Sequence, residues 1–152
     1  MKKYNKILLS KQNVSEDDLQ TLIQQLEENE CEVILSELEE KIEQLGDDEE
    51  IFIIEEVEKC DIVFVLIGGT EEENECVKKE IEEADKQEKL VIGIYMGGNA
   101  QSVPPALEKF GSGLITNDII KIMSVLQGNE CPWEDVTGGP RKPTKKIDTS
   151  EC

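Results

Sequence analysis

Glu80 is the residue of this sequence whose type and position best suit chemistry. It stands one position before Ile81, in a segment where Val77, Ile81 and Ala84 recur at helical spacing. That spacing predicts a place at the edge of the buried stripe of a helix, where a carboxylate can point into a cleft instead of bulk water. The plain alternative, on the pattern alone, is a solvated glutamate on the helix surface.

The sequence contains no histidine, which excludes Ser-His-Asp and Cys-His catalysis and histidine-based zinc sites. We therefore expect any chemistry to use carboxylates, hydroxyls, thiols or backbone amides, with no metal site. No C-x-x-C pair occurs among the cysteines, whose odd number and lack of a preceding export signal favour reduced thiols in a cytoplasmic protein. The five cysteines are Cys31, Cys60, Cys76, Cys131 and Cys152.

A strand, a helix and a second strand must position Glu80. Apolar runs at residues 62–67 and 90–95 flank the helical segment, and this order is typical of a βαβ unit with parallel strands. Gly68 and Gly69 end the first run, and Thr70 is a suitable residue to cap the helix. In open α/β folds, small molecules bind at the carboxyl ends of such strands.

The remaining pattern predicts one α/β domain at residues 1–128, with a flavodoxin-like, three-layer fold and a mainly parallel sheet of about five strands. We expect an irregular tail at residues 129–152, with Trp133 pinning its start to the domain. A helix capped by Ser15 and a last helix capped by Asn117 are also expected. The other expected strands are 4–10, 31–36 and 113–116, and the expected helices are 16–29, 38–45, 51–60, 106–110 and 118–127.

The charge excludes several partners. Thirty-five acidic residues against 16 basic residues give a net charge of −19, which repels phosphate backbones and anionic membrane surfaces. Nucleic acid and membranes are therefore not expected as partners. No apolar run approaches the roughly 20 residues that span a bilayer, so we expect a soluble protein.

The amino-acid sequence of the central segment resembles the sequences of a specific protein family. The sequences DIVFVLIGGT at 61–70, ECVKKEI at 75–81 and KLVIGI at 89–94 are similar to the TIR-like proteins of bacterial anti-phage Thoeris systems. In that family a strand ending in Leu-Ile-Gly leads to a helix with the pattern W-V-x-x-E-I, and then to a strand ending in Ile-Gly-Ile. The resemblance covers about a quarter of the chain, and Cys76 stands where the motif has tryptophan.

This resemblance implies a TIR-like fold and an enzyme that consumes NAD as a substrate, with no separate cofactor. It would be an NAD glycohydrolase or an ADP-ribosyl cyclase or transferase, whose nucleotide product activates an effector protein. The family's catalytic glutamate corresponds to Glu80, whose carboxylate would stabilise an oxocarbenium-like ribose. Self-association is implied as well. The residues implied to line the nucleotide pocket are Ser10, Lys11, Gly68, Gly69, Thr70 and Cys76.

Two alternatives from the residues stay open. One is a non-catalytic signalling or nucleotide-sensing scaffold with the same flavodoxin-like fold. The other is a nucleoside hydrolase or a deoxyribosyltransferase-like enzyme, because glutamates also serve in that glycosidic chemistry. The plain interpretations are that Ser10 ends a strand, that Gly68 and Gly69 permit a tight turn, and that Thr70 is a helix cap.

Overall fold

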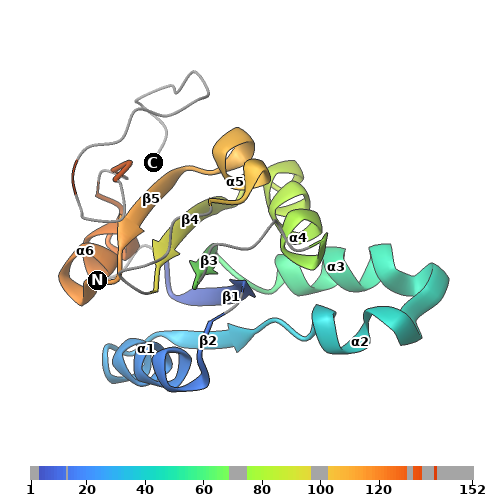
Figure 1. Ribbon diagram of the computed structural model, residues 1–152, viewed down its shortest axis with the longest axis horizontal. Helices are drawn as coiled ribbons and strands as arrows, with labels where there is room; N and C mark the ends of the chain where they lie inside the picture. Colours follow the sequence, from blue (N-terminus) through green and yellow to red (C-terminus); the bar gives the residue numbers. More distant parts are fainter. Residues whose placement is uncertain are drawn as a thin grey trace.

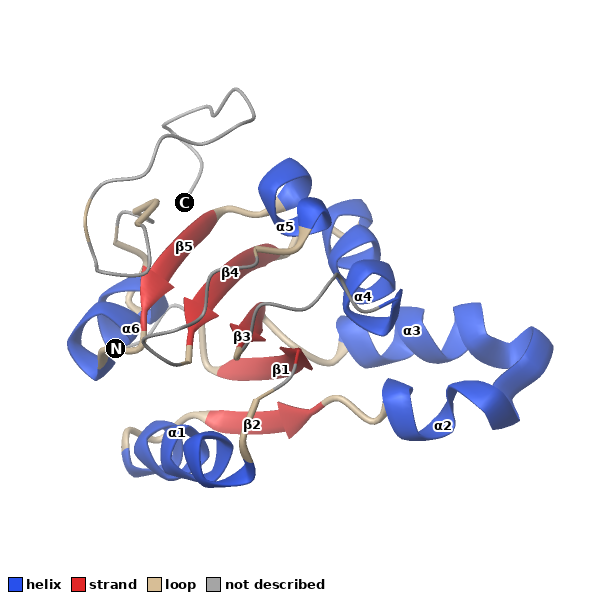
Figure 2. Ribbon diagram, viewed as in Figure 1, coloured by secondary structure: helices blue, strands red, loops and turns tan. Residues whose placement is uncertain are grey.

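A five-stranded, all-parallel sheet with the order β2-β1-β3-β4-β5 forms the centre of the protein. The computed structural model describes residues 4–12, 14–68, 75–96, 103–129, 132–134 and 139. Helices cover both faces of the sheet (Figures 1 and 2), which confirms the prediction of a flavodoxin-like, three-layer α/β fold. The strands are β1 (Lys6–Gln12), β2 (Glu32–Leu35), β3 (Ile62–Ile67), β4 (Leu90–Tyr95) and β5 (Gly113–Thr116).

Two separate apolar clusters pack the helices against the two faces of the sheet. The helices α1 (Glu16–Glu28) and α6 (Ile119–Leu126) cover one face. They pack there against strand side chains that include Ile7 and Leu9 of β1. The opposite face is covered by the remaining helices. These are α2 (Leu38–Leu45), α3 (Glu49–Glu58), α4 (Glu75–Lys86) and α5 (Pro105–Phe110).

The central strands are buried on both faces, as parallel strands between helix layers must be. All six residues of β3 are buried. Strand β1 lies between β2 and β3, with Ser10 beside Val65 and Lys11 beside Leu66. Helix α1 connects β1 to β2 over one face of the sheet, and helices α2 and α3 connect β2 to β3 over the other face. The strand order therefore reverses at β1, and ligands in such sheets bind outside the carboxyl ends of the strands at this point.

Most predicted boundaries agree with the structure. The strands at 62–67, 90–95 and 113–116 and the helix at 38–45 have the predicted bounds. Ser15 caps α1, where its Oγ accepts a hydrogen bond from the Asp18 backbone N–H at 3.3 Å. The helix predicted at 51–60 begins two residues earlier, after the 3₁₀ turn η1 (Gly46–Asp48).

The cap of the last helix was predicted one residue too early. Asp118, not Asn117, is the N-cap of α6, and its carboxylate accepts the backbone N–H of Ile120 at 2.9 Å. Both residue types suit this position, so the composition alone could not separate them.

The segment Pro132 to Glu134 lies along the outer side of β5. The Leu114 N–H donates to the Pro132 carbonyl at 2.9 Å, and the Glu134 N–H donates to the Leu114 carbonyl at 2.7 Å. Trp133 forms a parallel bridge with Leu114 and packs against the apolar cluster. The prediction that Trp133 pins the start of the tail is therefore confirmed.

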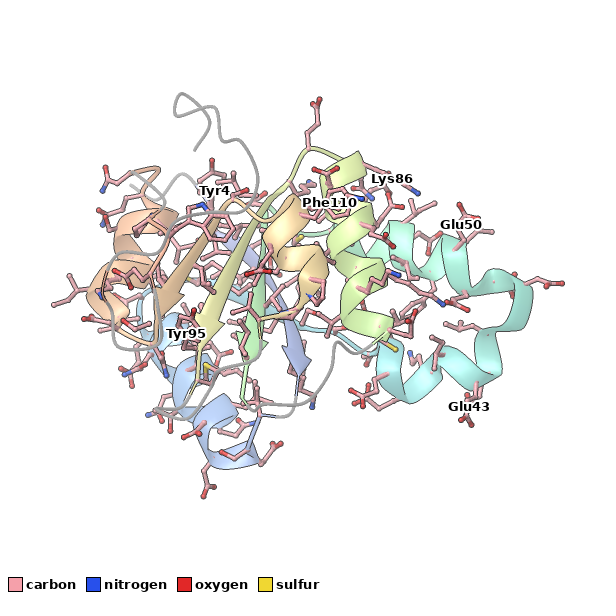
Figure 3. All side chains as sticks on the ribbon, turned by 45° about the horizontal axis from the view of Figure 1, so that its top comes forward. Tyr4, Glu43, Glu50, Lys86, Tyr95 and Phe110 are labelled. Atoms are coloured by element: carbon pink, nitrogen blue, oxygen red, sulfur yellow. The ribbon has the colours of Figure 1, made fainter. Side chains whose placement is uncertain are left out.

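Acidic residues lie on the outer surfaces of the helices. In Figure 3, Glu43 on α2 and Glu50 on α3 point away from the sheet, and both are exposed. Within the described residues, no helix is both long enough and apolar enough to cross a membrane.

Candidate functional site

Four buried polar side chains meet at the carboxyl end of the sheet. Ser10 comes from β1, Ser36 follows β2, Glu56 lies on α3 and Glu80 lies on α4. The exposed fraction is 0% for Ser10 and 1% for Glu80. Because a buried carboxyl group is costly without hydrogen bonds, these side chains must satisfy one another.

Ser10 and Glu80 form a direct hydrogen bond. The Ser10 Oγ donates to Glu80 Oε1 at 2.9 Å, although the two residues are 70 positions apart in the sequence. The two residues come from the central strand β1 and from α4, which packs against that strand. The sheet thus joins the two residues that the family resemblance assigned to one site.

Ser36 connects Glu80 to a second carboxyl group. Its Oγ lies 2.8 Å from Glu80 Oε2 and 3.0 Å from Glu56 Oε1. A hydroxyl carries one hydrogen, so it can donate to only one of these two oxygens. The other carboxyl group must be protonated and donate to Ser36.

The deeper burial of Glu80, 1% exposed against 7% for Glu56, favours the proton on Glu80. The Glu56 Oε2 accepts the backbone N–H of Glu37 at 3.1 Å, a contact that suits a carboxylate. Burial first, and the neighbouring Glu56 second, raise the pKa of Glu80 to about 9, against the opposing effect of its hydrogen bonds with Ser36 and Ser10. At neutral pH Glu80 is therefore a neutral acid in this conformation.

The space beside Glu80 is small. Lys11, Ser36, Glu39, Cys76 and Glu80 line a pocket with about 10 Å³ for the centre of a water molecule, which is about what one water needs. Glu80 is thus turned away from bulk water, as predicted, but the prediction that it lies at the edge of the buried stripe was wrong, because it is among the buried residues of α4. The carboxyl group is fully buried because Ser10 and Ser36 both draw it toward the sheet.

The cysteine of this pocket is not set up as a nucleophile. Burial first, and then the nearby carboxyl groups of Glu39 and Glu80, raise the pKa of the Cys76 thiol to about 11. A thiolate is the reactive form, so Cys76 acts here as a small packing residue. The part of the chain that the structure describes holds no cluster of side chains suited to a metal ion.

The other predicted pocket residues divide into two groups. Lys11 and Cys76 line the small pocket with Glu80, and Gly68 directly follows β3 at the same edge of the sheet. Gly69 and Thr70 lie outside the described residues. Lys79, a further cation on α4, pairs with Glu49 of α3.

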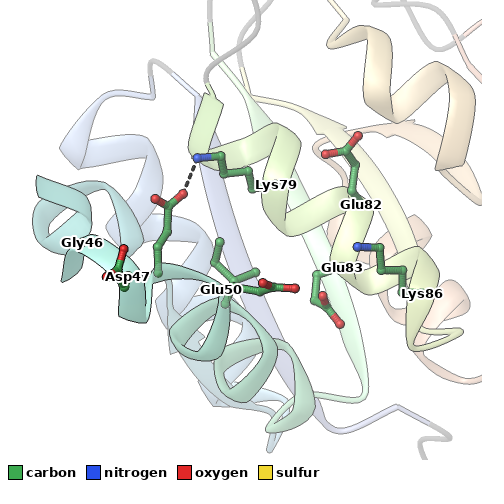
Figure 4. A pocket seen from close by; sticks show the side chains of 9 residues that line it. Gly46, Asp47, Glu50, Lys79, Glu82, Glu83 and Lys86 are labelled. Atoms are coloured by element: carbon green, nitrogen blue, oxygen red, sulfur yellow. Dashed lines mark hydrogen bonds and ion pairs between the residues drawn. The ribbon is translucent and has the colours of Figure 1, made fainter.

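A larger pocket of about 340 Å³ lies elsewhere, between the start of α3 and the outer side of α4. Figure 4 shows Glu50 of α3 on one side of it and Lys79, Glu83 and Lys86 of α4 on the other side. It does not include Ser10 or Glu80, and its lining is mainly acidic.

Comparison with known proteins adds no assignment. No protein-family model matches the chain, and no curated protein matches its sequence.

Ser36 and Glu56 are the site residues that sequence analysis missed. Ser36 ends a predicted strand, as Ser10 does, so the equivalent position could have drawn attention to it. Glu56 lies between Ile53 and Val57 on the inner face of a predicted helix, and all three are buried. A glutamate among inward positions was the available signal.

Proposed function

We propose that the Ser10–Glu80 pair is the catalytic centre of a TIR-like enzyme that cleaves NAD at the bond between nicotinamide and ribose. The observation that carries this proposal is the 2.9 Å hydrogen bond between Ser10 and Glu80 at the carboxyl edge of the parallel sheet. Further support comes from the resemblance of the central segment to Thoeris TIR-like proteins. On that resemblance, the product is a nucleotide signal for an effector protein in bacterial anti-phage defence.

Glu80 supplies the negative charge in this reaction. The glycosidic bond breaks with its electron pair moving to the pyridinium nitrogen, so that nicotinamide leaves as a neutral molecule. The ribose carbon becomes oxocarbenium-like, and the Glu80 carboxylate stabilises that charge. Water then adds to this carbon and loses a proton, or a hydroxyl of a second group adds in its place, giving hydrolysis, cyclisation or transfer.

The described residues also define what must change before the reaction. Glu80 must lose its proton and become accessible, because NAD cannot enter a pocket with space for about one water molecule. Ser10 keeps its hydrogen bond to Glu80 and holds the carboxylate in place. Lys11 is the cation that lines this pocket and is placed to meet the pyrophosphate, whereas Lys79 is engaged with Glu49.

The direct test is to incubate the concentrated protein with NAD and to follow nicotinamide release and the mass of the ribosyl product. The variants are Glu80→Gln and, as a matched control, Glu82→Gln on the same helix. We expect release by the wild type and by Glu82→Gln, none by Glu80→Gln, and faster release as the pH approaches the Glu80 pKa of about 9. Release that survives in Glu80→Gln would refute the assignment of Glu80.

The 1% exposed fraction of Glu80 favours a second function, a nucleotide-sensing scaffold without catalysis. In that case Glu80 serves only to join α4 to the sheet. Such a protein would be stabilised by NAD in a thermal melt without releasing nicotinamide at any pH, and Glu80→Gln would leave that stabilisation unchanged.

A further inference from the structure

Glu56 and Ser36 together form a second carboxyl arm of the site, which the proposed NAD chemistry does not use. Glu56 comes from α3, whereas Glu80 comes from α4, and Ser36 stands between them after β2. The exposed fraction of Glu56 is 7%. Two carboxyl groups buried around one hydroxyl cannot both be charged without strong repulsion.

The donors and acceptors of this arm form a complete chain. Ser10 donates to Glu80 Oε1, protonated Glu80 donates through Oε2 to Ser36, and Ser36 donates to Glu56 Oε1. The backbone N–H of Glu37 donates to Glu56 Oε2 at 3.1 Å, and that of Leu38 donates to Ser36 Oγ at 3.4 Å. Each hydrogen is used once if one of the two carboxyl groups carries the extra proton, and the deeper burial of Glu80, 1% exposed against 7% for Glu56, favours Glu80 as that group.

We propose that Glu56, acting through Ser36, is a positioning residue that helps to hold the buried Glu80 as a neutral acid, and that loss of the Glu56 charge favours the ionised form of Glu80. The consequence for catalysis rests on the proposed function. The enzyme would be inactive while α3 keeps Glu56 against Ser36 and active once that contact is broken.

The other charged groups near Glu80 do not replace Glu56 in this role. Lys11 from β1 and Glu39 from α2 line the same small pocket. Lys79 and Glu49 form an ion pair between α4 and α3 at the edge of the site. Of all these groups, Glu56 alone shares a bridging hydroxyl with Glu80.

Glu56→Gln tests the proposal with little change of shape. The new amide can still accept the Glu37 N–H, and it can donate to Ser36 Oγ. Ser36 is then free to donate its hydrogen to Glu80, which suits an ionised Glu80. The matched control is Glu58→Gln, which removes one exposed charge from the same helix.

The measurement is the pH titration of the Glu80 side-chain carboxyl carbon by NMR, with the signal assigned from its absence in Glu80→Gln. We expect a midpoint near 9 in the wild type and in Glu58→Gln, and a midpoint lower by more than about one unit in Glu56→Gln. At neutral pH the ionised fraction of Glu80 would then rise from about 1% to more than about 10%. Glu56→Ala removes the same charge and replaces Glu56→Gln if the latter does not fold.

A midpoint in Glu56→Gln that stays within about one unit of the wild type overturns the proposal, as does an ordinary carboxyl midpoint in the wild type. Nicotinamide release from NAD is measured on the same samples at neutral pH. A lowered midpoint with faster release supports the proposal and the NAD chemistry together. A lowered midpoint without release from any variant supports the proton-holding role and refutes the NAD chemistry.

Discussion

The hydroxyl of Ser10 and the carboxyl group of Glu80 join the central strand β1 to helix α4 through a 2.9 Å hydrogen bond that is buried on all sides. A bond of this kind affects stability as well as chemistry, because neither group can turn to water if its partner is lost.

We expect Ser10→Ala to destabilise the protein by about 1–3 kcal/mol, the cost of leaving a buried polar group without its partner. Urea unfolding measures this change. Ser124→Ala is the control: its Oγ accepts an exposed hydrogen bond from Asn129, and the expected change is within about 0.5 kcal/mol. A Ser10→Ala and Glu80→Ala double-mutant cycle, in which each single change removes the contact, should give a coupling of about 0.5–3 kcal/mol. Strict additivity of the two changes would contradict the contact.

Glu80 should make the stability of the protein fall as the pH rises. Its pKa is raised from 4.5 in the unfolded chain to about 9 in the folded protein, so between these values the folded state holds a proton that the unfolded state lacks. Unfolding free energy then decreases by about 1.4 kcal/mol per pH unit. The stabilising contribution is complete below the unfolded pKa and is lost as the pH rises to the folded pKa.

The variant Glu80→Gln removes this pH dependence. An amide can repeat the hydrogen bonds of the neutral acid, so we expect wild-type stability in mild acid and higher stability than the wild type in mild alkali. Urea unfolding over a pH series measures both, with Glu82→Gln as the control that keeps the wild-type slope. Parallel curves for Glu80→Gln and the wild type would show that Glu80 is ionised when folded.

Cys60 and Cys76 should resist alkylation in the folded protein. Burial raises the pKa of each thiol to about 11, so the thiolate fraction in mild alkali is on the order of 0.1%. Exposure to iodoacetamide, followed by digestion and mass spectrometry, gives the labelling of each cysteine. Labelling of either thiol in folded protein as fast as in urea would contradict this expectation.

Trp133 offers a separate probe of the outer side of β5, because it is the single tryptophan of the chain. Glu134 Oε1 accepts hydrogen bonds from the Thr116 N–H and from Lys121 Nζ, both at 3.0 Å. Glu134→Ala leaves the Thr116 N–H without this partner, at a cost of about 1–3 kcal/mol. In Glu134→Ala, we expect the Trp133 fluorescence emission to shift at a lower urea concentration than the one at which the circular dichroism signal of the helices is lost. Glu55→Ala, an exposed change on α3, should keep the two transitions together, and coincident transitions in Glu134→Ala would argue against the anchoring role.

The fold was predictable because its central strands are easy to recognise as apolar runs in the sequence. The runs at β3 and β4 are continuous and apolar, and a helical repeat lies between them, so that both their type and their bounds followed from the pattern. The predicted end of β1 at Ser10 was two residues too early. The strand continues to Gln12 because Lys11 and Gln12 pair with Leu66 and Ile67 of β3. Pairing partners of this kind are not visible in a local pattern.

The candidate site was only partly predictable. Ser10, Lys11, Cys76 and Glu80 do lie together, but their proximity depends on the order in which strands meet, which a local pattern does not contain. The burial of Glu80 was missed for a related reason. Helical spacing placed it at the edge of the apolar stripe, whereas Ser36 and Glu56, from distant parts of the chain, close over it.

The strand order also determines when the sheet can assemble during synthesis. Strand β1 lies between β2 and β3, so its second neighbour does not exist until the ribosome has made Ile67. Until then, Ile7, Leu8 and Leu9, which have 0% exposure in the finished protein, lack one of their covering strands. A nascent chain that stops before β3 therefore presents an unpaired apolar strand edge, the kind of surface that chaperones protect.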